Sequence, residues 1–304
     1  MEESLKRVLE DVNFLKKVNI FGRSKALTRL QVLKILQDNV QSVFDSENGE
    51  KYILKRSCSD SSLAGAAASK MYGDIGIQTP KILLSRQGKE QQVHSLQKDV
   101  SEIDGLEVLL ANNCFEYKQL ERDILGKYKW QIFYDSDLQN IFLSFMTKDC
   151  LEQLKNIYLV DELRTDRDRY LLNMFLYRVP GSEKYEGIIA IDLDEMAIFM
   201  FCNNLVKADF KSFLYFNYAS STPQQTLDSM CYANRVKEIQ GLIQDGVLFQ
   251  GNIDVLKKAL NYDFPKEVKK ACSICNIHGK RKNNIVEPIE RLWEYNNQTI
   301  GKDL

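Results

Sequence analysis

The chain of 304 residues is 44% hydrophobic and 10% aromatic, which is enough apolar material for one large domain or two lobes around well-formed cores. Its 41 Lys and Arg nearly balance its 42 Asp and Glu, so no overall field directs it toward nucleic acid or a membrane surface. No run approaches the roughly 18 apolar residues that a membrane helix needs, and the charged, amphipathic start of the sequence is unlike a cleavable signal.

The seven cysteines are scattered and odd in number, which favours reduced thiols in the cytoplasm over a disulfide framework. A protein secreted into a host cell as an effector, without a classical signal peptide, remains an open alternative. Cys272, Cys275 and His278 stand at ligand-like spacing, but a closed zinc site needs four ligands and no second pair follows. Because His94 and His278 are the only histidines, hydrolase triads are excluded.

The first hundred residues predict an amphipathic helix followed by a small mixed sheet with one helix. The segment SVFDSENGEKYILKRS, residues 42–57, has β-type residues around an Asn-Gly pair and predicts a hairpin whose second strand ends at Lys55. An Ala-rich helix with Ser and Asp at its start and Gly at its close is indicated over residues 59–76. Residues 79–97 predict two more strands around a Gly turn.

The pattern changes to longer helical periods around residues 98–112. Apolar residues recur at three and four spacing over residues 114–128 and 139–163. One island of strand, YEGIIAIDLDEMAIF, interrupts the helices at residues 185–199. We therefore expect an α+β fold with a sheet-containing lobe over residues 1–100 and a helical lobe over residues 101–304.

The segment ELRTDRDRYLLNMFLYR, residues 162–178, alternates Arg and Asp and then turns apolar. Asp168 is followed five residues later by Asn173, and about twenty residues further an apolar strand ends in Asp192. Phosphoryl transfer uses one carboxylate to orient the nucleophile and oxygen ligands to hold Mg²⁺ against a triphosphate. It also needs a cation on the phosphates, and Lys55 at the end of its hairpin strand is placed in sequence for that role.

These segments resemble the atypical branches of the protein-kinase-like superfamily: HipA-like kinases, type II phosphatidylinositol 4-kinases and bacterial effector kinases. DRYLLNMFLY is similar to their Asp-Arg-His-x-x-Asn-type loop, and IAIDLDE resembles their metal-binding segment. EKYILKRS looks like the nucleotide-lysine strand, and AAASKMYGDIGIQTPKILL resembles the helix and strand that follow it. The resemblance covers roughly residues 40–200 and implies a two-lobed kinase fold.

The resemblance also implies ATP in the cleft, with Mg²⁺ or Mn²⁺. By that match, Lys55 contacts the α- and β-phosphates and Asp168 is the catalytic Asp. Asn173 and Asp192 are the implied metal ligands. Asp194 is either an auxiliary ligand or a turn cap.

Three parts of the family's pattern are missing, one of them the His of the catalytic loop, where Asp166 or Tyr170 is nearby depending on the alignment. The helix after Lys55 has no Glu to pair with it, so either another acid takes over or the lysine is held differently. No Gly-rich loop is visible, and Gly22 stands nearly alone, although GRSKALTR could contact phosphates through Ser24, Lys25 and backbone N–H groups. The segment after Asp192 is too apolar for a long exposed activation segment, so substrate binding is expected to differ from that of ordinary protein kinases.

Several alternatives stay open. Taken alone, RTDRDR would be an ion-paired helix terminus, and Asn173 with the strand before Asp192 favours the functional interpretation. The basic loop HGKRKNN, residues 278–284, is interpreted as solvated, with an inositol phosphate or phosphoinositide site as the alternative. The leading hypothesis is an atypical kinase acting on protein hydroxyls, with no nucleic acid partner and no membrane span. A pseudokinase that serves as a scaffold or ligand sensor, a phosphoinositide kinase and a nucleotidyl transferase are the other hypotheses.

Overall fold

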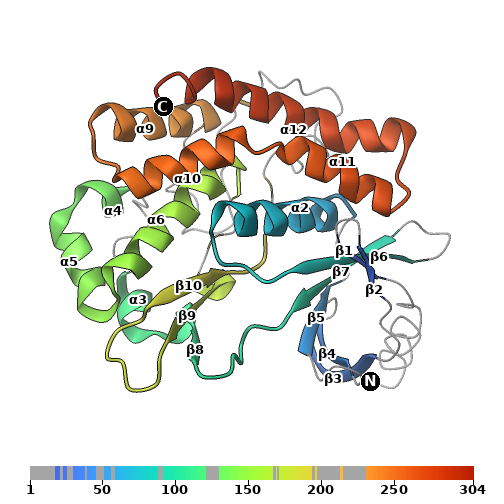
Figure 1. Ribbon diagram of the computed structural model, residues 1–304, viewed down its shortest axis with the longest axis horizontal. Coiled ribbons are helices and arrows are strands. Elements are labelled where there is room, and N and C mark those ends of the chain that lie inside the picture. The colour runs from blue at the N-terminus through green and yellow to red at the C-terminus, as the bar shows by residue number, and fades with distance from the viewer. Residues whose placement is uncertain are drawn as a thin grey trace.

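A computed structural model describes most of the chain and shows two antiparallel sheets beneath a layer of helices (Figure 1). The predicted N-terminal helix, residues 1–17, lies outside the described part, so that prediction stays untested. The described residues are 18–20, 23–25, 30–37, 40–45, 51–55, 59–87, 92–120, 130–166, 169, 171–193, 196, 213–214 and 231–304.

The larger sheet has seven strands in the order β2-β1-β6-β7-β5-β4-β3. Its described strand pairs are all antiparallel. The sheet is therefore antiparallel, whereas we expected a mixed sheet. The two predicted hairpins are confirmed, since β4 pairs with β5 and β6 pairs with β7. The strands are β1 (Val18–Ile20), β2 (Arg23–Lys25), β3 (Leu30–Gln37), β4 (Val40–Asp45), β5 (Lys51–Lys55), β6 (Ile82–Gln87) and β7 (Gln92–Lys98).

Helix α2 (Ser59–Ile75) lies between the larger sheet and the helical layer (Figure 1). It contacts β6 and β7 on one side and α11 (Phe264–Ile274) on the other, which explains why it is apolar nearly all round. The helix ends as the sequence predicted. Gly76 has a φ of 94°, and the Ile77 N–H donates to the Tyr72 carbonyl at 2.8 Å, which closes the last turn.

The smaller sheet has three antiparallel strands in the order β10-β9-β8. The predicted strand island is confirmed in part by β10 (Gly187–Ala190), and the apolar run after Asn173 forms a further strand, β9 (Met174–Arg178). Strand β8 (Glu107–Leu110) was missed, because it is only four residues long and falls where helical periodicity was expected to begin. Gly187 is needed in β10, since a Cβ there would collide with the ring of Tyr177.

Helix α6 (Lys148–Leu163) is buried along most of its length at the centre of the helical part. Its neighbour α10 (Gln250–Asn261) also contacts α2, so one continuous apolar core joins sheet and helices. The lobe boundary at residue 100 stays a prediction. The remaining helices among the described residues are η1 (Ala111–Asn113), α3 (Phe115–Leu120), α4 (Gln131–Tyr134), α5 (Ser136–Phe145), η3 (Leu171–Asn173), α9 (Tyr232–Gln244) and α12 (Gly279–Thr299).

Two features of the C-terminal segment differ from or add to the sequence analysis. The basic segment 278–284 is not a loop, because α12 begins at Gly279 and takes Lys280 into its first turn. Cys272 and Cys275 are buried at the end of α11, and burial raises the pKa of the Cys272 thiol to about 11. None of the described helices is both long and apolar enough to cross a membrane.

Candidate active site

The β9–β10 hairpin brings the predicted ligands Asn173 and Asp192 to the same end of the smaller sheet. Met174 pairs with Ala190, and one position further the Ile191 N–H donates to the Asn173 carbonyl at 3.0 Å. The register therefore continues past both strands and sets Asn173 beside the backbone that leads into Asp192. Two residues with oxygen-bearing side chains thus lie at one end of this sheet.

Lys55 reaches this edge from the larger sheet. Its Nζ forms an ion pair with Oδ1 of Asp192, and the two side chains are 15% and 28% exposed. Lys55 stands opposite Ser95 on β7, which in turn stands opposite Leu84 on β6. Since Leu84 belongs to the same apolar cluster as α2, the lysine projects from the face of the sheet that α2 covers.

Asp192 takes the part of the acid that α2 does not supply to Lys55. The acids of α2 are Asp60 and Asp74. Asp74 is engaged at the other end of the helix, where it pairs with Lys70 and accepts a hydrogen bond from the Tyr262 hydroxyl. Of the two alternatives left open by the sequence, the structure therefore supports the one in which another acid, Asp192, takes over.

The backbone at Asp192 is left-handed, with a φ of 56°, a conformation that costs free energy for a residue with a Cβ. Two buried arginines hold the carbonyls on either side of it. Arg169 Nη1 donates to the Ile191 carbonyl at 2.6 Å and to the Asn173 carbonyl at 2.9 Å. Arg164 Nη2 donates to the Leu193 carbonyl at 2.7 Å. These bonds fix the conformation from which the Asp192 carboxylate meets Lys55.

The arginines are themselves paired with buried carboxylates. Arg169 binds Asp161 through two contacts, Nε to Oδ2 at 2.8 Å and Nη2 to Oδ1 at 3.2 Å. Arg164 Nη1 lies 3.3 Å from Oδ2 of Asp166. Burial alone lowers the pKa of the Arg169 guanidinium, but Asp161 and Asp166 outweigh it and leave that pKa well above its usual range. A buried charge is tolerated only when paired and hydrogen-bonded, and these side chains meet that condition.

Of the alternating Arg and Asp residues in segment 162–169, the described Arg164, Asp166 and Arg169 are therefore ion-paired beside the end of α6, and they support the candidate site. The terminus is also strained. The Asp166 N–H donates to the Asp161 carbonyl at 2.8 Å, and this turn leaves Thr165 with a φ of 59°. A β-branched residue in that region is an outlier of the kind that gathers at functional sites.

Sequence reasoning missed two residues of this cluster, Asp161 and Tyr72. Asp161 left a signal, because it follows Leu154 and Ile157 at helical spacing on the buried face of α6, where an acid needs a buried partner. Tyr72 left none, since a tyrosine in an apolar helix is ordinary core. Its hydroxyl nevertheless donates to Oδ1 of Asp161.

Four predicted residues are not brought to Lys55 by the described contacts. Asp168 and Asp194 lie outside the described residues. Ser24 and Lys25 lie in β2, and β1, β6 and β7 stand between that strand and β5. The strand next to β5 on the other side is β4, so the β3–β4 hairpin occupies the position beside the lysine strand. Phosphate contacts from Ser24 and Lys25 stay a prediction.

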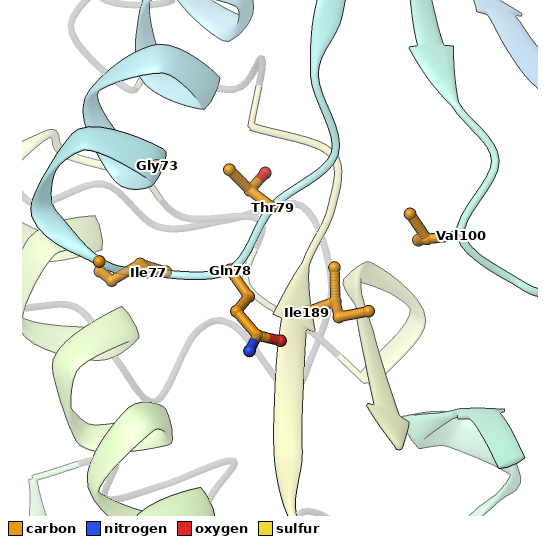
Figure 2. Close-up of a pocket in the computed structure, with 7 residues that line it drawn as sticks. Gly73, Ile77, Gln78, Thr79, Val100 and Ile189 are labelled. Atoms are coloured by element: carbon orange, nitrogen blue, oxygen red, sulfur yellow. The ribbon is translucent and has the colours of Figure 1, made fainter. Parts of the chain in front are cut away.

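A pocket of about 410 Å³ lies next to the strand that leads into the site (Figure 2). The Ala190 N–H donates to the Gln78 carbonyl at 2.9 Å, which ties this pocket's wall to β10. Lys55, Asn173 and Asp192 do not line it, so it is not assigned to the nucleotide. The lining residues are Gly73, Gly76, Ile77, Gln78, Thr79, Val100 and Ile189.

The donor set at the sheet edge fits a hard cation. Asn173 and Asp192 offer an amide oxygen and a carboxylate oxygen. Mg²⁺ and Mn²⁺ prefer oxygen ligands, whereas zinc is bound mainly by nitrogen and sulfur. In the described part of the chain, no three His, Cys, Asp or Glu side chains gather into a metal-binding group. Asp194, the expected auxiliary ligand, lies outside the described residues.

No family model matches the sequence, and no curated protein matches it either. The structure is similar to the crystal structure of the Helicobacter pylori proinflammatory kinase CtkA, with a TM-score of 0.56 and 15% identity over 90% of this chain and 95% of that chain. It is also similar to a chain in the Shewanella oneidensis MR-1 toxin–antitoxin complex of HipA, HipB and operator DNA, with a TM-score of 0.50 and 10% identity over 98% of this chain and 71% of that chain. The chain thus has the HipA-like, atypical protein-kinase-like fold that its sequence predicted.

Proposed function

We propose that this chain is an atypical kinase that transfers the γ-phosphate of ATP to protein hydroxyls with Mg²⁺ or Mn²⁺. The observation that carries the proposal is the ion pair between Lys55 of the larger sheet and Asp192, at the sheet edge that also carries Asn173. A phosphate-binding cation and two oxygen ligands for a metal ion are the parts that phosphoryl transfer requires in one place.

Each residue has a role in this proposal. Lys55 binds the α- and β-phosphates, and Asn173 and Asp192 hold the metal ion, with Asp194 as an auxiliary ligand. When bound there, a metal ion would supply positive charge to the phosphates. Since the Lys55 and Asp192 side chains are partly exposed, their ion pair can open to admit these partners without leaving a buried charge unpaired.

Asp168 is the proposed base. The acceptor hydroxyl oxygen forms a bond to the γ-phosphorus, while the bond from that phosphorus to the β–γ bridging oxygen breaks and ADP leaves. The hydroxyl proton passes to the Asp168 carboxylate and from there to solvent. A positioned base of this kind contributes about 10²–10⁴-fold to the rate.

The similarity of the fold to that of the Helicobacter pylori proinflammatory kinase CtkA supports the proposal. The test is incubation of the purified protein with Mg²⁺, γ-labelled ATP and a generic protein acceptor, beside the variants Asp168→Asn and Lys55→Met. Lys51→Met is the matched control, because Lys51 lies on the same strand and face but pairs with Glu102 at 2.5 Å.

We expect label on protein from the wild type and the control, and at least a hundredfold less from both site variants. Full transfer by Asp168→Asn would overturn the assignment. Parallel reactions decide between acceptors and chemistries. Label from α-labelled ATP would indicate nucleotidyl transfer, and label confined to phosphoinositide vesicles would indicate a lipid kinase.

A pseudokinase that binds nucleotide without turnover is the second candidate. One observation favours it: α2 offers Lys55 no Glu, and the lysine instead occupies Oδ1 of the metal-ligand candidate Asp192. Stoichiometric ATP binding measured by calorimetry, without label transfer to protein, lipid or water, would support this candidate over the kinase.

A further inference from the structure

Helix α2 is joined to the segment before the predicted catalytic loop through the side chain of Tyr72. The residue is fully buried, and its hydroxyl donates to Oδ1 of Asp161. The same hydroxyl accepts a hydrogen bond from Arg164 Nη1 at 3.4 Å. Burial, followed by the charge of Asp161, raises the pKa of Tyr72 well above its usual range, so the hydroxyl remains a donor.

Arg164 connects this hydroxyl to the metal-ligand segment. Its Cζ lies 5.3 Å from the ring centroid of Tyr72 and 5.8 Å from that of Phe264 on α11, so two aromatic rings hold the planar guanidinium. One end of the group meets Tyr72, while Nη2 at the other end donates to the Leu193 carbonyl. A lysine could not reproduce both contacts.

A second chain of contacts starts at the same hydroxyl. Asp161, which accepts from Tyr72, is bound by Arg169, and Arg169 donates to the Ile191 carbonyl. The two routes therefore leave one side chain on α2 and end on the two carbonyls that flank Asp192. The hydrogen bonds along them are buried, except that from Arg169 to the Ile191 carbonyl, which is part-buried, so water competes little for these donors and acceptors.

We propose that Tyr72 and Arg164 are positioning residues that couple helix α2 to the backbone of Asp192, the acid that pairs with Lys55 in place of one on the helix. The left-handed backbone of Asp192 is costly and persists only when its surroundings hold it. A shift of α2 would move the Tyr72 hydroxyl, release the flanking carbonyls and turn the carboxylate away from Lys55. The inference rests on the proposed function and names what orients its metal ligand.

Tyr72→Phe is a suitable probe, because it removes one hydroxyl and keeps the buried ring. Asp161 then retains both contacts with Arg169, and Arg164 retains Asp166 and Leu193, so no charge is left unpaired. The matched control is Tyr117→Phe. Tyr117 is as deeply buried, and its hydroxyl shares a hydrogen bond with that of Tyr158 at 3.2 Å. Arg164→Lys is the second variant, which keeps the charge and loses the planar fork.

The first measurement is hydrogen exchange in the nucleotide-free protein. The Ile191 amide, which donates to the Asn173 carbonyl, reports on the segment directly. We expect its exchange to quicken by about five- to tenfold in Tyr72→Phe, the order given by one lost hydrogen bond, and by more in Arg164→Lys. Tyr117→Phe should leave this amide unchanged. Equal exchange in the two tyrosine variants would overturn the inference, whether or not the chain is an enzyme.

The second measurement is Mn²⁺ binding to the ATP complex, followed by calorimetry or electron paramagnetic resonance. Tyr72→Phe should weaken Mn²⁺ binding by about five- to tenfold while leaving metal-free ATP binding unchanged, and kcat should fall without a rise in the KM for the acceptor. Unchanged Mn²⁺ binding would contradict the proposal. If the wild type binds no nucleotide and transfers no phosphate, the proposed function fails, while the exchange comparison still decides the coupling.

Discussion

Two ion pairs meet at the segment 191–193, and they differ in how far water reaches them. The Lys55–Asp192 pair is 15% and 28% exposed, whereas Arg169 and Asp161 are 0% and 3% exposed. A partly exposed pair adds little stability and can exchange partners. A buried pair cannot, because removing one member leaves a charge in a medium of low dielectric. Both pairs join a basic and an acidic side chain. Exposure rather than residue type therefore distinguishes the pair that is proposed to take part in chemistry from the pair that holds the backbone in place.

The largest effect on stability is expected from Arg169→Met, which removes the buried ion pair with Asp161. The substitution leaves Asp161 buried without its main partner, and we expect the free energy of unfolding to fall by about 3–5 kcal/mol. Urea denaturation measures it. The control is Arg178→Met, since Arg178 pairs with Glu107 at 2.7 Å on the surface and should be nearly neutral. Equal losses from the two variants would show that burial does not set the cost.

Lys55→Met tests the partly exposed ion pair with Asp192. Without nucleotide, the free energy of unfolding should change by less than about 1 kcal/mol, because Asp192 regains water when its partner is lost. Phosphoryl transfer should nevertheless fall by about a hundredfold or more. Thermal melting and single-turnover kinetics on the same preparation check both expectations. A loss of stability comparable to that of Arg169→Met would mean that Lys55 has a structural role like that of Arg169.

Local patterns in the sequence accounted for much of the fold. The β4–β5 and β6–β7 hairpins and helix α2 were predictable, because turn residues, Ala content and a closing Gly act over a few residues. Strand β8 was not, since its partner β9 lies far along the chain and its four residues carry no clear period. Segment 278–284 was misread as a loop because its charges suggested solvent rather than the first turns of a helix.

The candidate site was predictable in its parts and not in its connections. The order and spacing of Lys55, Asn173 and Asp192 are visible in the sequence and match what the proposed phosphoryl transfer would use. The ion pair between Lys55 and Asp192 depends on the register of two sheets and on the left-handed backbone of Asp192. Neither can be predicted from the local sequence. Tyr72 is the extreme case, because its role exists only once α2 and α6 are packed together.

The smallest effect on stability is expected at Asp74. This residue is an exposed carboxylate on α2, in contrast to the partly exposed and buried pairs above. Burial alone would raise its pKa, but hydrogen bonds from Lys70 and Tyr262 outweigh it and leave the pKa below the usual 3.8. An acid with a lowered pKa stabilises the fold above its unfolded pKa, and this contribution is lost as pH falls through the folded value.

Asp74→Asn should therefore lower the free energy of unfolding by less than about 1 kcal/mol at pH 7, because both partners are open to water. The difference from the wild type should shrink as the pH falls below 3.8, since the wild-type carboxylate is then protonated as well. Denaturant unfolding at pH 7 and near pH 3 measures both values. A difference that grows in acid would mean that Asp74 is held in its neutral form, and α2 would then be anchored at this end by burial, as it is at Tyr72.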